Sequence, residues 1–185
     1  MKALDSFITA YIELETQVRQ LQADLFSKTC GLCTACCCRV DICEESIQSA
    51  FLSLLLKRQA LGEEDMAERY GWLDQHGCTL EYGRPPVCYA FFCDELLARL
   101  PDDETRDVVR VLGRLMEYIG ENAVMDCHLV EIMDAGDLVH ADFEALHGRL
   151  EMARQLLEVI ESFIETGRLD ATDRAALEAI GSSES

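Results

Sequence analysis

The chain has 185 residues, 49% of them hydrophobic, and this length and composition fit one domain with a sizeable core. Its 35 acidic residues outnumber 16 Lys and Arg, and the formal net charge of −19 disfavours nonspecific attraction to nucleic acid or an anionic membrane. The N-terminal stretch MKALDSFITA lacks the apolar segment of a signal peptide, and the apolar runs are too short to span a bilayer. We therefore expect a soluble, cytoplasmic chain with no nucleic-acid or membrane partner.

A long amphipathic helix over residues 4–25 is the first element that the sequence predicts. Its apolar residues recur at alternating spacings of three and four, which places them on one stripe of a helix. This stripe, here called the N-terminal seam, consists of Leu4, Phe7, Tyr11, Leu14, Val18, Leu21 and Leu25. The polar residues expected outside the seam include Glu13, Glu15, Gln17 and Arg19. One face of this helix is thus predicted to enter a core.

The first cysteine block, KTCGLCTACCCRVDIC at residues 28–43, holds six of the chain's ten cysteines. Two-residue gaps separate Cys30, Cys33 and Cys36, and such gaps bring sulfur atoms to metal-ligand distance on one side of a tight turn. The spacing matches the first three ligands of a bacterial ferredoxin run, but valine occupies the position of the fourth. A further ligand must therefore come from elsewhere in the chain.

Two more helices are predicted after this block, over residues 44–60 and 63–75. The first of them carries acids in its first turn, where they favour helix formation. Strand signals are scarce throughout the chain, so we expect the fold to be mostly α.

The second cysteine block is HGCTLEYGRPPVCYAFFC, residues 76–93, which contains Cys78, Cys88 and Cys93. Between these cysteines lies an Arg-Pro-Pro turn, and proline fixes its own φ and restricts the residue before it. The turn is expected to present Cys88 on a preorganised loop, which lowers the entropic cost of ligation. The block is therefore the source of candidate ligands that the first block lacks, and His76 is the histidine best placed to join them.

The C-terminal half is predicted to be helical, with helices over residues 94–100, 102–119 and 143–164. The short apolar run at residues 123–133 fits either a helix or a strand, and we interpret it as a helix. The helix over residues 143–164 repeats the three-and-four spacing, and Gly167 supplies a stop. This C-terminal seam consists of Phe143, Leu146, Leu150, Ala153, Leu157, Ile160 and Ile164. Because each seam lasts only about three heptads, we expect the two helices to pack together inside one domain rather than in a long dimeric coiled coil.

The isolated cysteine and histidine residues of this half are predicted to have structural roles rather than catalytic or metal-binding ones. Cys127 lies alone on an apolar segment and is predicted to be a small buried hydrophobe. Its neighbour His128 follows it directly, and adjacent side chains on a helix do not face each other, which disfavours a nucleophilic pair. His140 and His147 are expected to be solvated or packed rather than metal-binding.

The two cysteine blocks together resemble the YkgJ-type cysteine-cluster proteins, which are described as zinc- or iron-chelating domains. Cys30, Cys33, Cys36 and Cys37 match the CxxCxxCC pattern of that family. Its second motif is matched by Cys78, Arg84, Pro85 and Cys88, with a cysteine six residues before the Arg-Pro and another three after the proline. The resemblance covers roughly residues 30–93, and it departs from the family in the aromatic residue before the Arg-Pro and in Tyr89 after the last cysteine. Cys38 and Cys43 are additional to the pattern.

The resemblance implies metal ligation by six cysteines, namely Cys30, Cys33, Cys36, Cys37, Cys78 and Cys88. Six thiolates exceed one tetrahedral site, so either one site with two neighbouring thiols or a binuclear centre would fit. The expected architecture is a single domain over residues 1–185, in which residues 1–27 and 94–180 form a helical framework. Between them, residues 28–93 form a cysteine-rich loop lobe held together by the metal.

The sequence leaves three functional hypotheses open. We expect a cysteine-ligated metal-binding protein with a [4Fe–4S] cluster ahead of zinc, because nearly all candidate ligands are sulfur. One alternative is a cluster-dependent enzyme for methyl transfer or redox chemistry; flagellin lysine methylase, which looks like a larger relative, is linked to iron–sulfur-dependent methyl transfer. The other is a zinc-held scaffold whose acidic helices contact a protein partner. A secreted disulfide framework is disfavoured because the core is ample and a signal peptide is lacking.

Overall fold

The structure, a computed structural model, describes residues 2–30, 39–74 and 77–181, and it is mostly helical, as the sequence predicts. An antiparallel strand pair joins β1 (Leu73–Asp74) to β2 (Gly77–Cys78). No helix in these three ranges is both long and apolar enough to cross a lipid bilayer. The α-helices are α1 (Lys2–Cys30), α2 (Val40–Gln48), α3 (Ala50–Arg58), α4 (Val87–Ala90), α5 (Asp94–Ala98), α6 (Asp103–Gly120), α7 (Phe143–Thr166) and α8 (Ala171–Gly181). The 3₁₀ helices are η1 (Glu63–Asp65), η2 (Leu129–Glu131) and η3 (Asp137–His140).

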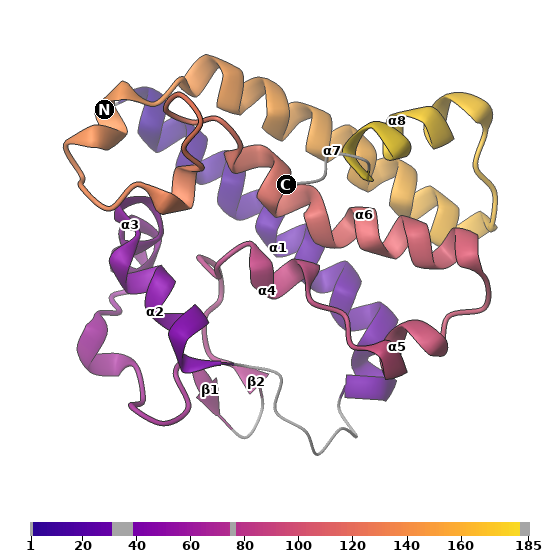
Figure 1. Cartoon of the computed structure of the whole chain (residues 1–185), viewed down its shortest axis with the longest axis horizontal. Coiled ribbons are helices and arrows are strands. Elements are labelled where there is room, and N and C mark those ends of the chain that lie inside the picture. Colours follow the sequence, from indigo (N-terminus) through magenta and orange to yellow (C-terminus); the bar gives the residue numbers. More distant parts are fainter. Residues whose placement is uncertain (1, 31–38, 75–76, 182–185) are drawn as a thin grey trace.

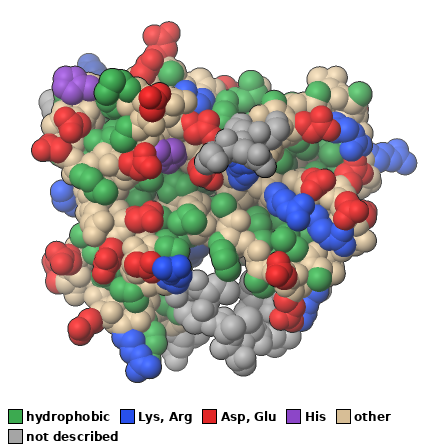
Figure 2. All heavy atoms as spheres, viewed as in Figure 1, with side chains coloured by type: hydrophobic (Ala, Val, Ile, Leu, Met, Phe, Trp, Pro, Cys, Tyr) green, Lys and Arg blue, Asp and Glu red, His purple; other side chains and the backbone are tan. Residues whose placement is uncertain are grey.

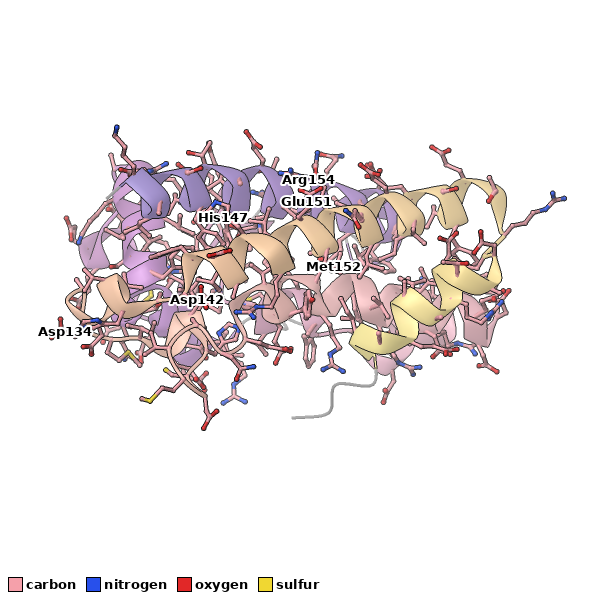
Figure 3. All side chains as sticks on the ribbon, turned by 90° about the horizontal axis from the view of Figure 1, so that it is seen from above. Asp134, Asp142, His147, Glu151, Met152 and Arg154 are labelled. Carbon is pink, nitrogen blue, oxygen red and sulfur yellow. The ribbon has the colours of Figure 1, made fainter. Side chains whose placement is uncertain are left out.

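The two long helices α1 and α7 pack side by side, which confirms the prediction that their seams meet within one chain (Figure 1). The ring centroid of Phe7 in α1 lies 5.8 Å from that of Phe143 and 5.4 Å from that of His147, both in α7. Both seams enter the same hydrophobic core. At the edge of this contact, Arg154 of α7 forms a 3.8 Å ion pair with Glu13 of α1, and Figure 3 shows Arg154 on the side of α7 that borders α1.

Helix α6 completes the framework by packing on α7, α8 and α4. Asp102 begins it as an N-cap, because its side chain accepts a 2.7 Å hydrogen bond from the amide of Thr105. Asp142 caps α7 in the same way, and Gly167 ends α7 in the left-handed conformation, with a φ of 66°. The two helices predicted over residues 102–119 and 143–164 are confirmed, with ends within two residues of those predicted, and so is the glycine stop.

The single helix predicted over residues 44–60 is wrong, because two helices, α2 and α3, occupy this region. The break falls at Ser49, whose ψ of 125° is extended rather than helical. The Ser49 hydroxyl accepts a 3.2 Å hydrogen bond from the amide of Leu52 and so caps the start of α3. The apolar pattern continues across the break, and periodicity alone therefore does not reveal it.

The helix predicted over residues 63–75 is also wrong. Only the short η1 forms there, followed by turns and by β1. Gly71 adopts a φ of +59°, a conformation that interrupts a right-handed helix, and this turn directs Trp72 into a small core. Burial of the large Trp72 ring therefore prevails over local helix propensity here.

The helix predicted over residues 123–133 is wrong as well. Asn122 and Met125 have φ values of 50° and 53°, and a β-bridge joins Val124 to Cys127. The segment then continues through η2. Helix α8, for which the apolar pattern predicts no bounds, packs on α6 and contributes Leu177 and Ile180 to the core.

Three hydrophobic clusters lie in the described part of the chain. The main core joins both long helices to α3 and to Tyr89, so part of the segment 28–93 shares the core of the framework. A second cluster, here called the Trp72 cluster, consists of Cys43, Leu56, Trp72 and Leu80. A third joins Phe26, near the end of α1, to Leu96 of α5 and Val109 of α6.

Candidate metal centre

The first cysteine block begins where α1 ends. Cys30 is the last residue of that helix, whereas Cys33, Cys36, Cys37 and Cys38 lie outside the described residues, as does His76. The described chain resumes at residue 39, directly before α2. The positions of α1 and α2 therefore fix the two ends of the segment 31–38.

The second cysteine block lies on two short elements. Cys78 belongs to β2, where it pairs with Leu73, and its half-buried side chain packs against the Trp72 cluster. Cys88 lies in the first turn of α4, and its thiol is exposed. The amide of Cys88 donates a 2.9 Å hydrogen bond to the carbonyl of Pro85, so the proline turn and the helical turn are continuous.

Near both ends of the first block, the chain contacts residues in or beside the second block. Near the end of α1, the ring of Phe26 lies 5.5 Å from that of Phe92, which is next to Cys93. In α2, the carbonyl of Cys43 accepts a 3.3 Å hydrogen bond from the indole of Trp72. In Figure 1 the end of α1 lies beside α5, and α2 begins on the side of the β1–β2 pair. Two stretches that are far apart in sequence therefore meet at one end of the molecule.

Sequence reasoning missed Glu15, which it placed outside the N-terminal seam. The Glu15 carboxylate is fully buried and accepts three hydrogen bonds, each from a residue of the second cysteine block. The donors are the amide of Gly83 at 2.8 Å, the amide of Arg84 at 3.0 Å and the hydroxyl of Tyr89 at 2.7 Å. The sequence marks this contact only by an acidic residue next to a seam residue. Exposed positions of a helix show the same pattern, so it does not identify a buried acid.

The burial of Glu15 shifts its own pKa and affects the pKa values of two buried tyrosines. Desolvation raises the pKa of Glu15 above its ordinary value, while its three hydrogen bonds and the nearby Arg84 guanidinium act in the opposite direction. Burial, together with the Glu15 charge, also raises the pKa values of Tyr11 and Tyr89 well above 10.0. Both phenols therefore stay protonated near neutral pH, which keeps the Tyr89 hydroxyl a donor.

Arg84 lies inside the second block. Its guanidinium donates hydrogen bonds of 3.4 Å to the carbonyl of Cys78 and 3.3 Å to that of Leu80. These two bonds tie the proline turn to Cys78 at the end of β2 and to the residues that follow it.

The remaining described cysteines occupy packed positions. Cys43 is buried in the Trp72 cluster, and a Cβ atom added at Gly71 would lie 2.5 Å from its sulfur. Cys93 precedes α5 and packs against the third cluster. Cys127 packs on the main core, and desolvation and Glu131 raise the pKa of its thiol. His128 donates from Nε2 to the Glu117 carbonyl of α6 at 2.8 Å and accepts at Nδ1 from the Val130 amide at 3.3 Å, so both ring nitrogens are engaged away from the Cys127 thiol.

Among the described side chains, in the ranges 2–26, 39–74 and 77–181, no group of three or more His, Cys, Asp or Glu residues is arranged to hold a metal ion. A thiolate centre in this protein would therefore need ligands from residues 27–38. Two cavities of about 850 and 740 Å³ lie elsewhere, one between α6 and α8 and one beside η2, and no described cysteine lines either of them. On the face shown in Figure 2, carboxylates are spread widely rather than gathered at one point.

No family model, curated protein or solved structure matches this chain.

Proposed function

We propose that this chain binds metal through the thiolates of its two cysteine blocks, and that it holds an iron–sulfur cluster in preference to zinc in a reducing cytoplasm. The proposed ligands are the six cysteines of the CxxCxxCC and Arg-Pro motifs: Cys30, Cys33, Cys36, Cys37, Cys78 and Cys88. A donor set made of sulfur suits both iron–sulfur clusters and zinc, and it suits magnesium or calcium poorly.

The observation that carries this proposal is that the chain near both described ends of the segment 31–38 contacts residues in or beside the second block. Phe26 packs on Phe92 at the end of α1, and α2 hydrogen-bonds to Trp72 beside the strand that precedes Cys78. The described chain on either side of residues 31–38 thus contacts Phe92 of the second block and Trp72 beside that block. These contacts support a centre to which both blocks contribute ligands.

The test is metal and sulfide analysis of protein purified without oxygen, together with its visible absorption spectrum. An iron–sulfur cluster gives iron, acid-labile sulfide and broad visible absorption, whereas zinc gives a colourless protein. The paired variant Cys33→Ser with Cys88→Ser is expected to lose the metal. Cys127→Ser is the matched control and should retain it, because Cys127 packs on the main core. Neither iron nor zinc after anaerobic reconstitution would contradict the proposal.

A further inference from the structure

Three polar side chains on α1 hold the second cysteine block. Glu15, Arg19 and Gln22 are spaced four and three residues apart, which places them on one face of the helix. All three form hydrogen bonds to residues between Leu80 and Tyr89. We call this set the α1 clamp.

Glu15 fixes the loop through groups on both sides of Cys88. Its carboxylate accepts from the amides of Gly83 and Arg84, which precede Cys88, and from the hydroxyl of Tyr89, which follows it. A buried carboxylate needs such donors, since burial of a charge without hydrogen bonds is costly. The loop backbone is therefore restricted to positions that satisfy the carboxylate.

Arg19 and Gln22 extend the contact along the same face. The Arg19 guanidinium donates to the carbonyls of Leu80 at 2.9 Å and Glu81 at 2.7 Å, two and three residues after Cys78. The Gln22 amide donates to the carbonyl of Tyr89 at 3.0 Å. Together the three side chains constrain the backbone close to both cysteines of the second block.

The same helix also carries the first metal-ligand candidate. Cys30 lies eight residues after Gln22, and a continuous helix of that length advances about 12 Å. A helix is stiff over this distance. The α1 clamp thus sets the position of the second block relative to the start of the first block.

We propose that Glu15, Arg19 and Gln22 are positioning residues for the metal centre, holding Cys78 and Cys88 in the geometry that ligation together with the first block requires. The inference rests on the proposed function, because it assigns these residues an effect on metal affinity. Hydrogen bonds are directional, whereas apolar contacts are not. The bonds from α1 to backbone amides and carbonyls of the loop therefore fix its position more precisely than apolar packing alone would.

Glu15→Gln is the sharpest test, since an amide keeps the shape of the side chain but has one acceptor oxygen. The Glu15 oxygens face two backbone amides, one each, so either orientation of a glutamine turns its NH₂ group toward an N–H donor. The full-length variant would be titrated anaerobically with Co²⁺, and affinity read from thiolate-to-cobalt absorption in competition with a chelator. We expect affinity to fall about tenfold, the scale seen when partners that orient metal ligands are removed.

A milder pair of variants, at the half-buried Arg19 and the exposed Gln20, guards against loss of folding. Arg19→Gln removes the contacts to Leu80 and Glu81, whereas Gln20→Ala, one residue along, removes only a 3.0 Å contact to Asp24 on the same helix. Arg19→Gln should weaken Co²⁺ binding and Gln20→Ala should not. Urea unfolding of the metal-depleted proteins would be measured in parallel.

The outcomes separate the two proposals. If the unaltered protein shows no thiolate-to-cobalt absorption, the proposed function fails. If it binds Co²⁺ and the folded Arg19→Gln protein binds equally well, positioning by this set is wrong. A loss of apo-protein stability in Glu15→Gln without a change in Co²⁺ affinity would likewise overturn the inference, because it would reduce the α1 clamp to a purely structural contact.

Discussion

Gly71 is the residue where backbone conformation and side-chain packing restrict the sequence most directly. Its φ of +59° lies in the left-handed region that favours glycine, and a Cβ atom added there would lie 2.5 Å from the sulfur of Cys43 and 2.8 Å from its Cβ. The turn at Gly71 is what allows Trp72 to contact α2. One glycine therefore allows the contact between Trp72 and Cys43 of the first block.

Gly71→Ala should destabilise the protein by about 3 kcal/mol, the sum of a left-handed alanine and an overpacked contact. Gly167→Ala is the matched control, because Gly167 has a φ of +66° and nothing lies within 4 Å of its added Cβ atom. The control should cost about 1 kcal/mol, from conformation alone. Urea unfolding monitored by circular dichroism measures both, and equal losses would show that Cys43 moves aside without cost.

Glu15 should give the stability of the protein a specific pH dependence. Its pKa is raised in the folded state by burial, so the folded protein binds the Glu15 proton more tightly than the unfolded chain does. The contribution of that proton to stability is complete below the ordinary pKa of 4.5 and is lost as pH rises through the folded-state pKa. The free energy of unfolding of the unaltered protein, minus that of Glu15→Gln, should therefore fall as pH rises across this interval.

The subtraction is needed because many other carboxylates titrate in the same range. Tyr89→Phe serves as a control that removes one hydrogen bond to Glu15 and keeps the acid. The free energy of unfolding of Tyr89→Phe, minus that of Glu15→Gln, should still fall as pH rises. A difference that stays flat or rises with pH would show that the hydrogen bonds to Glu15 outweigh its desolvation.

At the scale of elements, the contact between α1 and α7 supports the fold through matched apolar faces. Leu14 is fully buried and Leu157 is 2% exposed, both in the main core. Leu14→Asp and Leu157→Asp should each lower the free energy of unfolding by about 4 kcal/mol, since each buries a charge without a partner.

The exposed neighbours Gln17 and Gln155 provide matched controls on the same two helices. Gln17→Asp and Gln155→Asp should each change stability by less than about 0.5 kcal/mol, as is usual for surface positions. Chemical denaturation of the four variants measures the contrast. Leucine variants that unfold no more easily than the glutamine variants would contradict the packing described for α1 and α7.

Long helices could be predicted from the sequence because a seam of seven apolar residues repeats one spacing many times. The break at Ser49 and the turns at Gly71 and Asn122 could not, because each depends on a single residue while the surrounding apolar pattern continues. The cysteine spacing could also be read directly as a candidate site. Glu15 was missed for a different reason: helical periodicity describes the face toward one neighbour, and the second block packs on α1 from another direction.

At the scale of the whole molecule, the cysteine-rich segment is divided between two cores. Helix α3 and Tyr89 belong to the main core with α1 and α7, whereas Cys43, Trp72 and Leu80 form the smaller Trp72 cluster. Cys78 packs on that cluster. A metal that joins Cys78 to the first block would therefore stabilise the Trp72 cluster most directly and the main core least.

Metal removal should loosen the Trp72 cluster and leave the long helices folded. Trp72 is the sole tryptophan of the chain, is 3% exposed, and donates a 2.8 Å hydrogen bond from its indole to the hydroxyl of Ser46. Its fluorescence therefore reports on this cluster alone. Chelation, or Cys33→Ser with Cys88→Ser, should shift its emission to longer wavelength while helical circular dichroism changes little.

Amide exchange locates the same change along the chain. Residues 66–84, in and around the Trp72 cluster, should exchange faster after metal removal, whereas residues 10–22 of α1 and 146–162 of α7 should keep their protection, because their apolar contacts include no metal ligand. Ligation that closes the span between the blocks can supply on the order of 10 kcal/mol toward local order, so the contrast should be large. If chelation instead melts α1 and α7 in the same transition as the Trp72 cluster, the two cores unfold as one cooperative unit, and the metal stabilises all of it.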